Sequence, residues 1–334
     1  MIVNQLSLKS LSTHLRADLF SLSVLSTMLS LPNRPSFSRS IARSALLGAF
    51  LFLSGLSSSR AEEVSVYLLL GQSNMDGRGK ISDLPDSRKG QRDGVLINYH
   101  NSASVNSGGW QTLAPGYSMP PNSTSLPAPT FGLELGFADR LQQRGAEQNI
   151  ALLKVSKGGT SLYEDWNPGN RSGQSKGAMY ALLESALTSA TMELEQNGDT
   201  LRFGGVIWHQ GEADAAAKRT SAQYEADLKN FIGEVRSLTS QPDLAFVMGE
   251  VPDVSRRETI RSAQVNIVST VPQTALVSAN GLTLQDDGVH LDANGLIVFG
   301  ERYADATQSI VPEPATVGMA LLPSLILLAR RRPR

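Results

Sequence analysis

Three residues have side chains of the types that carry out nucleophilic catalysis, although they lie far apart in the chain. Ser73 lies just after the apolar run 64–70, and Asp287 precedes His290 by three residues. A serine hydroxyl is a poor nucleophile until a neighbouring imidazole takes its proton. A carboxylate that holds the imidazole ring and stabilises its charged form completes such a relay. We therefore expect Ser73 to be the nucleophile, His290 the base and Asp287 the acid.

Two further polar segments offer hydrogen-bond donors for the oxyanion that such chemistry creates. The backbone N–H groups of Ser73 and Gly159 qualify, because a glycine permits a close approach. The side-chain amide of Gln210 is a third candidate. A second carboxylate, Glu212, lies two residues beyond Gln210. The identity of the acid therefore stays open between Asp287 and Glu212.

The elements that must position these residues follow from the apolar patterning. It predicts strands at 64–70, 95–99, 149–155, 203–208, 244–249 and 274–278, and helices at 133–141, 178–196, 221–238, 257–269 and 293–307. Strands that alternate with helices indicate an α/β fold with a parallel sheet covered on both faces. The segments of Ser73, Gly159 and Gln210 each follow a strand, so they should gather at one sheet edge, within reach of His290. The stretch 101–130 lacks periodicity and forms either a pocket wall or plain surface.

Five short motifs in the central region resemble those of one group of enzymes. They are Gly71-Gln72-Ser73-Asn74-Met75 with Gly77-Arg78, Phe131-Gly132-Leu133-Glu134-Leu135-Gly136, Gly158-Gly159-Thr160-Ser161, Trp208-His209-Gln210-Gly211-Glu212-Ala213-Asp214, and Asp287-Gly288-Val289-His290-Leu291. Together they resemble the SGNH (GDSL-like) hydrolases, and among these the sialate O-acetylesterases and acetylxylan esterases of carbohydrate esterase family 6. The resemblance implies a three-layer α/β/α, flavodoxin-like fold and deacetylation of carbohydrates without a cofactor. It assigns the nucleophile to Ser73, the base to His290, and oxyanion donors to Gly159 and Gln210.

Several other polar and aromatic residues have two readings. Tyr163 and Trp166, in the loop after the second glycine motif, either stack on a sugar ring or cover the core. His209 follows a buried strand, so we expect a packed and hydrogen-bonded histidine. A metal site drawn from His209, Asp214 and His290 has little support, because the chain has four histidines and no cysteine.

The composition bounds the possible functions. The chain has 334 residues, and 41% of them are hydrophobic, which is enough for a sizeable core. A net charge of −1 argues against non-specific binding of nucleic acid. The absence of cysteine excludes disulfides, thiolate metal sites and a cysteine nucleophile.

The amino-terminal part has the pattern of a secretory signal peptide. Three arginines between residues 34 and 43 precede an apolar run at 45–56, which small residues follow up to Ala61. The run is too short for an ordinary membrane span. We expect cleavage after Ala61, and Met28 is an alternative start, because residues 1–33 are long for the basic region of a signal peptide.

The carboxyl terminus resembles a PEP-CTERM sorting signal. Pro312-Glu313-Pro314 precedes an apolar run at 316–329, and three arginines follow it. The resemblance implies transient retention in the inner membrane, processing by an exosortase and delivery to the cell surface or extracellular matrix. The alternative is a plain amphipathic tail or tail anchor.

These patterns divide the chain into an amino-terminal extension with signal peptide at 1–61, an esterase domain at 62–310 and a sorting tail at 311–334. We expect a secreted serine esterase that removes O-acetyl groups from polysaccharide or sialic acid through an acyl-enzyme. The alternative is a catalytically silent protein of the surface or matrix that keeps the same fold to bind glycans. An intact set of Ser73, Asp287 and His290 favours the enzyme.

Overall fold

The computed structural model of the protein describes residues 62–145, 149–254 and 257–311. The signal peptide expected within 1–61 lies outside the described residues, and so does the sorting tail apart from Val311. No helix within the described ranges is long and apolar enough to cross a membrane.

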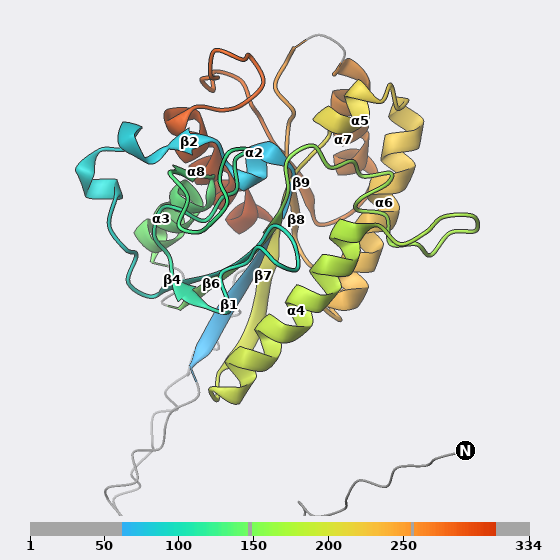
Figure 1. Ribbon diagram of the computed structural model, residues 1–334. Coiled ribbons are helices and arrows are strands. Elements are labelled where there is room, and N and C mark those ends of the chain that lie inside the picture. Colours follow the sequence, from blue (N-terminus) through green and yellow to red (C-terminus); the bar gives the residue numbers. More distant parts are fainter. Residues whose placement is uncertain (1–61, 146–148, 255–256, 312–334) are drawn as a thin grey trace, which may run out of the picture. The chain divides into compact units, whose positions relative to one another are not determined.

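A seven-stranded sheet, with the strand order β4-β3-β6-β1-β7-β8-β9, forms the centre of the fold (Figure 1). Its strands are β1 Glu63–Gly71, β3 Val95–His100, β4 Gln111–Thr112, β6 Ile150–Ser156, β7 Thr200–His209, β8 Phe246–Gly249 and β9 Thr274–Val277. Neighbouring strands run parallel, except that β4 at the edge is antiparallel to β3. The expected parallel sheet is therefore confirmed, with β4 as an addition that the sequence did not indicate.

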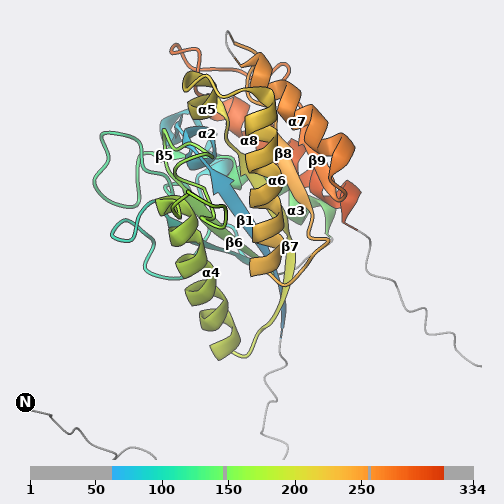
Figure 2. The ribbon, with the colours of Figure 1, turned by 90° about the vertical axis from the view of Figure 1, so that its right-hand side faces the viewer.

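Helices cover both faces of this sheet. They are α2 Ser73–Asp76, α3 Glu134–Arg144, α4 Ala178–Gln196, α5 Glu212–Ala216, α6 Ser221–Leu238, α7 Glu258–Thr270 and α8 Ala293–Ile310. Helices α4, α6 and α7 pack on one face, and α3 and α8 pack on the other (Figures 1 and 2). The three-layer α/β/α arrangement is thus confirmed.

Strand β1 lies in the middle of the sheet and is buried on both sides. Val66, Leu68 and Leu70 belong to the core under α4, α6 and α7. Tyr67 and Leu69 point the other way and belong to the core under α3 and α8. Because successive side chains of a strand alternate between the two faces, a strand covered by helices on both is expected to be apolar along most of its length. This is why the buried part of β1 is apolar except for Ser65, whose hydroxyl accepts from Arg202 Nη2 at 2.6 Å.

The carboxyl ends of the central strands reach the same level. Gly71 at the end of β1 pairs with Ser156 of β6 and with His209 of β7. The polar segments that follow these strands therefore begin side by side, as the sequence predicted. The shorter elements are the two-stranded sheet of β2 Gly79–Lys80 and β5 Thr130–Phe131, and the 3₁₀ helices η1 Ile81–Asp83 and η2 Asp86–Arg88.

Candidate active site

The turn after β1 places Ser73 at the edge of an open cavity. Gly71 has φ of +152°, and a Cβ there would lie 2.1 Å from the carbonyl oxygen of His209. Glycine is therefore required at this position. The N–H of Gln72 donates to the same carbonyl at 3.0 Å, which fixes the direction of the turn. Ser73 follows as the first residue of α2, and its side chain borders an open cavity.

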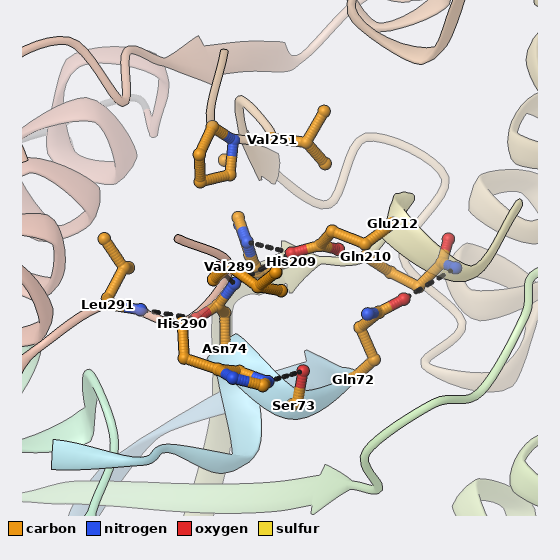
Figure 3. A network of polar contacts seen from close by, with 12 residues as sticks. Gln72, Ser73, Asn74, His209, Gln210, Glu212, Val251, Val289, His290 and Leu291 are labelled. Carbon is orange, nitrogen blue, oxygen red and sulfur yellow. Dashed lines mark hydrogen bonds and ion pairs between the residues drawn. The ribbon is translucent and has the colours of Figure 1, made fainter. Parts of the chain in front are cut away.

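The structure brings Ser73, His290 and Asp287 into one line of contacts. His290 Nε2 lies 3.0 Å from Ser73 Oγ, a contact that is drawn as a dashed line in Figure 3. His290 Nδ1 lies 2.6 Å from Asp287 Oδ2. A carboxylate at Nδ1 holds the ring proton there, so Nε2 presents its lone pair to the serine hydroxyl. This geometry allows His290 to take the proton of Ser73.

The carboxylate of Asp287 is also fixed by its own loop. Its Oδ1 accepts hydrogen bonds from the backbone N–H groups of Val289 at 2.8 Å and His290 at 2.9 Å. Burial acts to raise the pKa of Asp287, but the hydrogen bonds from the backbone and ring of His290 and from Val289 outweigh it and lower the pKa to about 2. Asp287 is therefore ionised at neutral pH and can stabilise a charged imidazole.

The second carboxylate, Glu212, has a different partner. Its Oε1 lies 3.4 Å from Nε2 of the buried His209 and accepts from Asn74 Nδ2 at 2.8 Å. Burial acts to raise the pKa of Glu212, but the charge of His209 and the hydrogen bonds outweigh it and lower the pKa to about 2. His209 packs edge-on against Phe299, as expected of a core histidine. Asp287, and not Glu212, is thus the carboxylate in contact with His290.

A cavity of about 580 Å³ opens beside Ser73 and His290. It is lined by Gln72, Ser73, Arg78, Asn101, Met119, Pro120, Pro121, Ser123, Lys157, Gly158, Gly159, Glu212, Ala213 and His290. Five of these residues come from the aperiodic stretch 101–130. That stretch is therefore a wall of the cavity, which decides between the two readings that the sequence left open.

The wall is anchored to the core by a buried lysine. Lys154 on β6 is fully buried, and its Nζ donates to the carbonyl of Tyr117 at 2.7 Å and to that of Asp76 at 2.8 Å. The same ammonium pairs with the carboxylate of Glu134 at 2.7 Å. Asp76 holds the wall a second time, because its Oδ2 accepts from the N–H of Met119 at 3.1 Å. The backbone that leads into the cavity is thus held from two sides.

The expected oxyanion donors differ in where they lie. Ser73 and Gly159 both border the cavity. Gln210 is fully buried and does not line it. Its Nε2 donates to Asp214 Oδ2 at 2.6 Å and to the carbonyl of Thr160 at 3.1 Å. The assignment of Gln210 as an oxyanion donor is therefore wrong for this structure, because its amide nitrogen is buried away from the cavity and its two hydrogens are shared among three protein acceptors, the third being Gln72 Oε1 at 3.2 Å.

Gln72 is a donor candidate that the sequence reasoning missed. It borders the cavity next to Ser73, and its Oε1 accepts from Gln210 Nε2 at 3.2 Å and from the N–H of Ala213 at 3.3 Å. With the oxygen held on that side, the Nε2 of Gln72 points away from Gln210 (Figure 3) and is the amide atom left to serve as a donor. The sequence feature that could have identified Gln72 is its position directly before Ser73, in a turn whose backbone is fixed by Gly71.

The two aromatic candidates lie outside the cavity. Trp166 is completely buried and packs edge-on against Trp208, with 5.3 Å between the ring centroids. A substrate contact by Trp166 is therefore wrong, and the residue covers the core. Tyr163 is 40% exposed but does not line the cavity, and the Arg219 guanidinium lies 4.1 Å from its ring centroid. A stacking role for Tyr163 on a sugar stays a prediction.

The family model described as "Carbohydrate esterase, sialic acid-specific acetylesterase" matches residues 63–309. The chain belongs to this family. The match contains the whole relay of Ser73, Asp287 and His290, and it makes this protein a member of a family of carbohydrate acetylesterases.

Similar proteins agree with this assignment. The probable carbohydrate esterase At4g34215 of Arabidopsis thaliana is 23% identical over 266 residues, which cover 72% of this chain and 89% of the relative. The X-ray structure of that protein has a TM-score of 0.57 at 20% identity, over 75% of this chain and 98% of the other. The crystal structure of NanS has a TM-score of 0.54 at 14% identity, again over 75% of this chain and 98% of the other. These structures share the fold.

Proposed function

We propose that the protein is an exported serine esterase that removes O-acetyl groups from carbohydrates through an acetyl-enzyme. One observation carries the proposal: contacts run from Asp287 to His290 at 2.6 Å and from His290 to Ser73 at 3.0 Å, beside an open cavity. Membership of a carbohydrate esterase family supports an acetylated sugar as the substrate.

In the first half of the reaction, Ser73 Oγ attacks the carbonyl carbon of the acetyl group while His290 Nε2 takes the hydroxyl proton. Asp287 stabilises the imidazolium that forms. The negative charge moves to the former carbonyl oxygen, and the proposed donors to it are the N–H groups of Ser73 and Gly159 and the amide of Gln72, because all three residues border the cavity. His290 then gives its proton to the departing sugar oxygen as the ester bond breaks, and acetyl-Ser73 remains.

The second half repeats these steps with water. His290 takes a proton from a water molecule, whose oxygen attacks the acetyl carbon. The bond to Ser73 Oγ breaks, and the serine oxygen recovers its proton from His290. The products are acetate and the deacetylated sugar. Each proton that His290 takes is returned within the same half-reaction, so the cycle needs no cofactor.

Both cationic and anionic side chains line the cavity beside Ser73. Arg78 and Lys157 both line the cavity with Ser73. Arg78 Nη1 donates to Asp76 Oδ2 and to the carbonyl of Gly77, while Arg78 Nη2 lies on the side of Gly158. A guanidinium edge and an ammonium attract a carboxylate. Because Arg78 is already paired with Asp76 and the carboxylate of Glu212 also lines the cavity, the ranking of acetylated sialic acid ahead of neutral acetylated xylan is supported by the family description rather than by the charge of the lining.

Export is part of the same proposal, and its support is the sequence alone. A signal peptide at 1–61 and a PEP-CTERM-like tail at 311–334 would send the enzyme through the inner membrane to the surface or matrix, with an exosortase-type enzyme as processing partner. Cell fractionation, with sequencing of both ends of the mature protein, tests this. A mature chain that still begins at Met1 or Met28 would contradict it.

Acetate release tests the activity directly. The wild-type protein and Ser73→Ala should be compared on acetylated sialic acid, acetylated xylan and acetylated algal polysaccharides. We expect turnover on at least one, highest on the acidic sugar, and a loss on the order of 10⁶-fold in Ser73→Ala. Glycan binding without acetate release in the wild type would instead identify a catalytically silent glycan-binding protein.

A further inference from the structure

The residue after the nucleophile makes three contacts that the proposed reaction does not use. Asn74 is almost fully buried and lies outside the cavity lining. Its Oδ1 accepts from the N–H of Leu291 at 3.0 Å. Its Nδ2 donates to the carbonyl of Val289 at 3.2 Å and to Oε1 of Glu212 at 2.8 Å.

Two of these contacts lie on either side of the base. Val289 and Leu291 are the chain neighbours of His290, so one side chain holds the backbone before and after the imidazole (Figure 3). Because Asn74 is also the chain neighbour of Ser73, it links the nucleophile turn directly to the base loop. We propose that Asn74 is a positioning residue that sets the distance between Ser73 Oγ and His290 Nε2.

The hydrogen-bonding pattern requires an amide at this position. Leu291 offers a donor, whereas Val289 offers a carbonyl and Glu212 a carboxylate, so residue 74 must accept on one side and donate twice on the other. Glu212 is in turn placed by His209, 3.4 Å away. This buried carboxylate, which the reaction leaves without a role, therefore orients the Asn74 amide.

A second tie keeps the base loop folded when Asn74 is changed. Gln285 Nε2 donates to the carbonyl of Arg78 at 2.8 Å and to that of Leu291 at 3.1 Å. The N–H of Gln285 donates to the carbonyl of His290 at 2.7 Å. Loss of the Asn74 side chain should therefore remove some of the contacts of the loop and displace His290. The contacts of Gln285 remain, so the domain should stay folded.

The positioning role rests on the proposed esterase reaction, so its test has one readout from catalysis and one from the loop itself. Asn74→Ala removes all three contacts, and misplacing the base by about 1 Å costs on the order of 10²-fold in kcat. KM should change little, because Asn74 does not line the cavity. Asn98→Ala is the matched control, since Asn98 is equally buried but lies on β3 and contacts Ser107. It should leave kcat per active site unchanged.

Asn74→Asp keeps the shape of the side chain but replaces the NH₂ donor by an oxygen that can only accept. A carboxylate oxygen would then face Glu212 at about the present 2.8 Å, and two like charges at this distance repel. We expect Asn74→Asp to lose at least as much kcat as Asn74→Ala. Adding Glu212→Gln places an amide donor opposite the introduced carboxylate and returns the total charge to that of the wild type. The double variant should therefore recover part of the loss, which mere damage to folding would not produce.

The rate of amide hydrogen exchange measures how firmly the base loop is held, independently of activity. In Asn74→Ala the amide of Leu291 loses its acceptor, so exchange in the peptide 286–292 should become faster than in the wild type, and in Asn98→Ala it should not. Unchanged exchange, or unchanged kcat per titrated active site, in Asn74→Ala and Asn74→Asp would overturn the positioning role. An inactive wild type would refute the proposed function, while exchange would still decide whether Asn74 holds the loop. If Asn74→Ala does not fold, the double variant decides through its recovery over Asn74→Asp.

Discussion

Replacing Asp287 by asparagine should reverse the proton arrangement of the relay. Asp287 Oδ1 accepts from the N–H groups of Val289 at 2.8 Å and His290 at 2.9 Å. The amide oxygen of the variant must take that place, because an NH₂ group cannot face two donors. The NH₂ group then takes the place of Oδ2, 2.6 Å from His290 Nδ1, and donates to it. The ring proton moves to Nε2, which faces Ser73 and can no longer accept its proton.

The expected size of this effect follows from the same geometry. The contacts of the loop remain, so the fold and the cavity should be intact and KM should stay close to the wild-type value. The wrong tautomer costs about 10⁴-fold in kcat in serine proteases, and we expect about the same here. A factor of 10⁴ corresponds to about 5 kcal/mol of activation free energy.

The assay is steady-state hydrolysis of a small acetyl ester, normalised by the number of titratable active sites. Asp286→Asn is the matched control: it makes the same substitution at the exposed neighbouring position and should leave kcat unchanged. Glu212→Gln should cost far less than Asp287→Asn, since Glu212 contacts His209 and Asn74. A larger loss in Glu212→Gln, or an active Asp287→Asn enzyme, would refute the reasoning.

Two further results are expected. Gln72→Ala should lower kcat on the order of 10²–10³-fold if its amide serves the oxyanion. Gln210→Ala should lower kcat by a smaller factor, because Gln210 acts through its contact with Gln72. If kinetic measurements give the larger loss for Gln210→Ala, the oxyanion role belongs to Gln210. Stability should fall as the pH drops from about 4.5 to 2, because Asp287 and Glu212 have pKa values lowered to about 2 from 3.8 and 4.5, so the unfolded chain binds protons first. Thermal unfolding at a series of pH values measures this, and Glu212→Gln should flatten the curve; an unchanged curve would show that Glu212 is not held as a charged group.

The sequence was sufficient for the fold and for the residues that form the relay. Apolar runs that end in polar motifs placed Ser73 and His290 at one edge of a parallel sheet, and the structure agrees. The direction of a side chain could not be predicted in the same way. Gln210 follows the correct strand, but its amide turns into the core. Trp166 likewise follows a glycine turn, and only the packing of the layers determines that it faces Trp208.

The choice between Asp287 and Glu212 shows the same limit. Both carboxylates belong to segments that follow a strand in the sequence, and both are ionised at neutral pH. What separates them is a local turn, in which Val289 and His290 bend back onto Asp287. Such short-range backbone geometry leaves no clear signal in residue type or spacing, whereas the long apolar strands do.

The anchoring of the wall by Lys154 has a consequence for how the substrate range of this enzyme could be altered. Moving that wall would take the Tyr117 carbonyl away from the buried ammonium of Lys154, and a buried donor left unsatisfied costs about 1–3 kcal/mol. The rim at 119–123 is thus a rigid template that is already shaped before a sugar arrives. Single substitutions in this rim should therefore change the substrate selectivity and leave the backbone in place. Replacement of the whole loop would remove the contacts that hold the backbone.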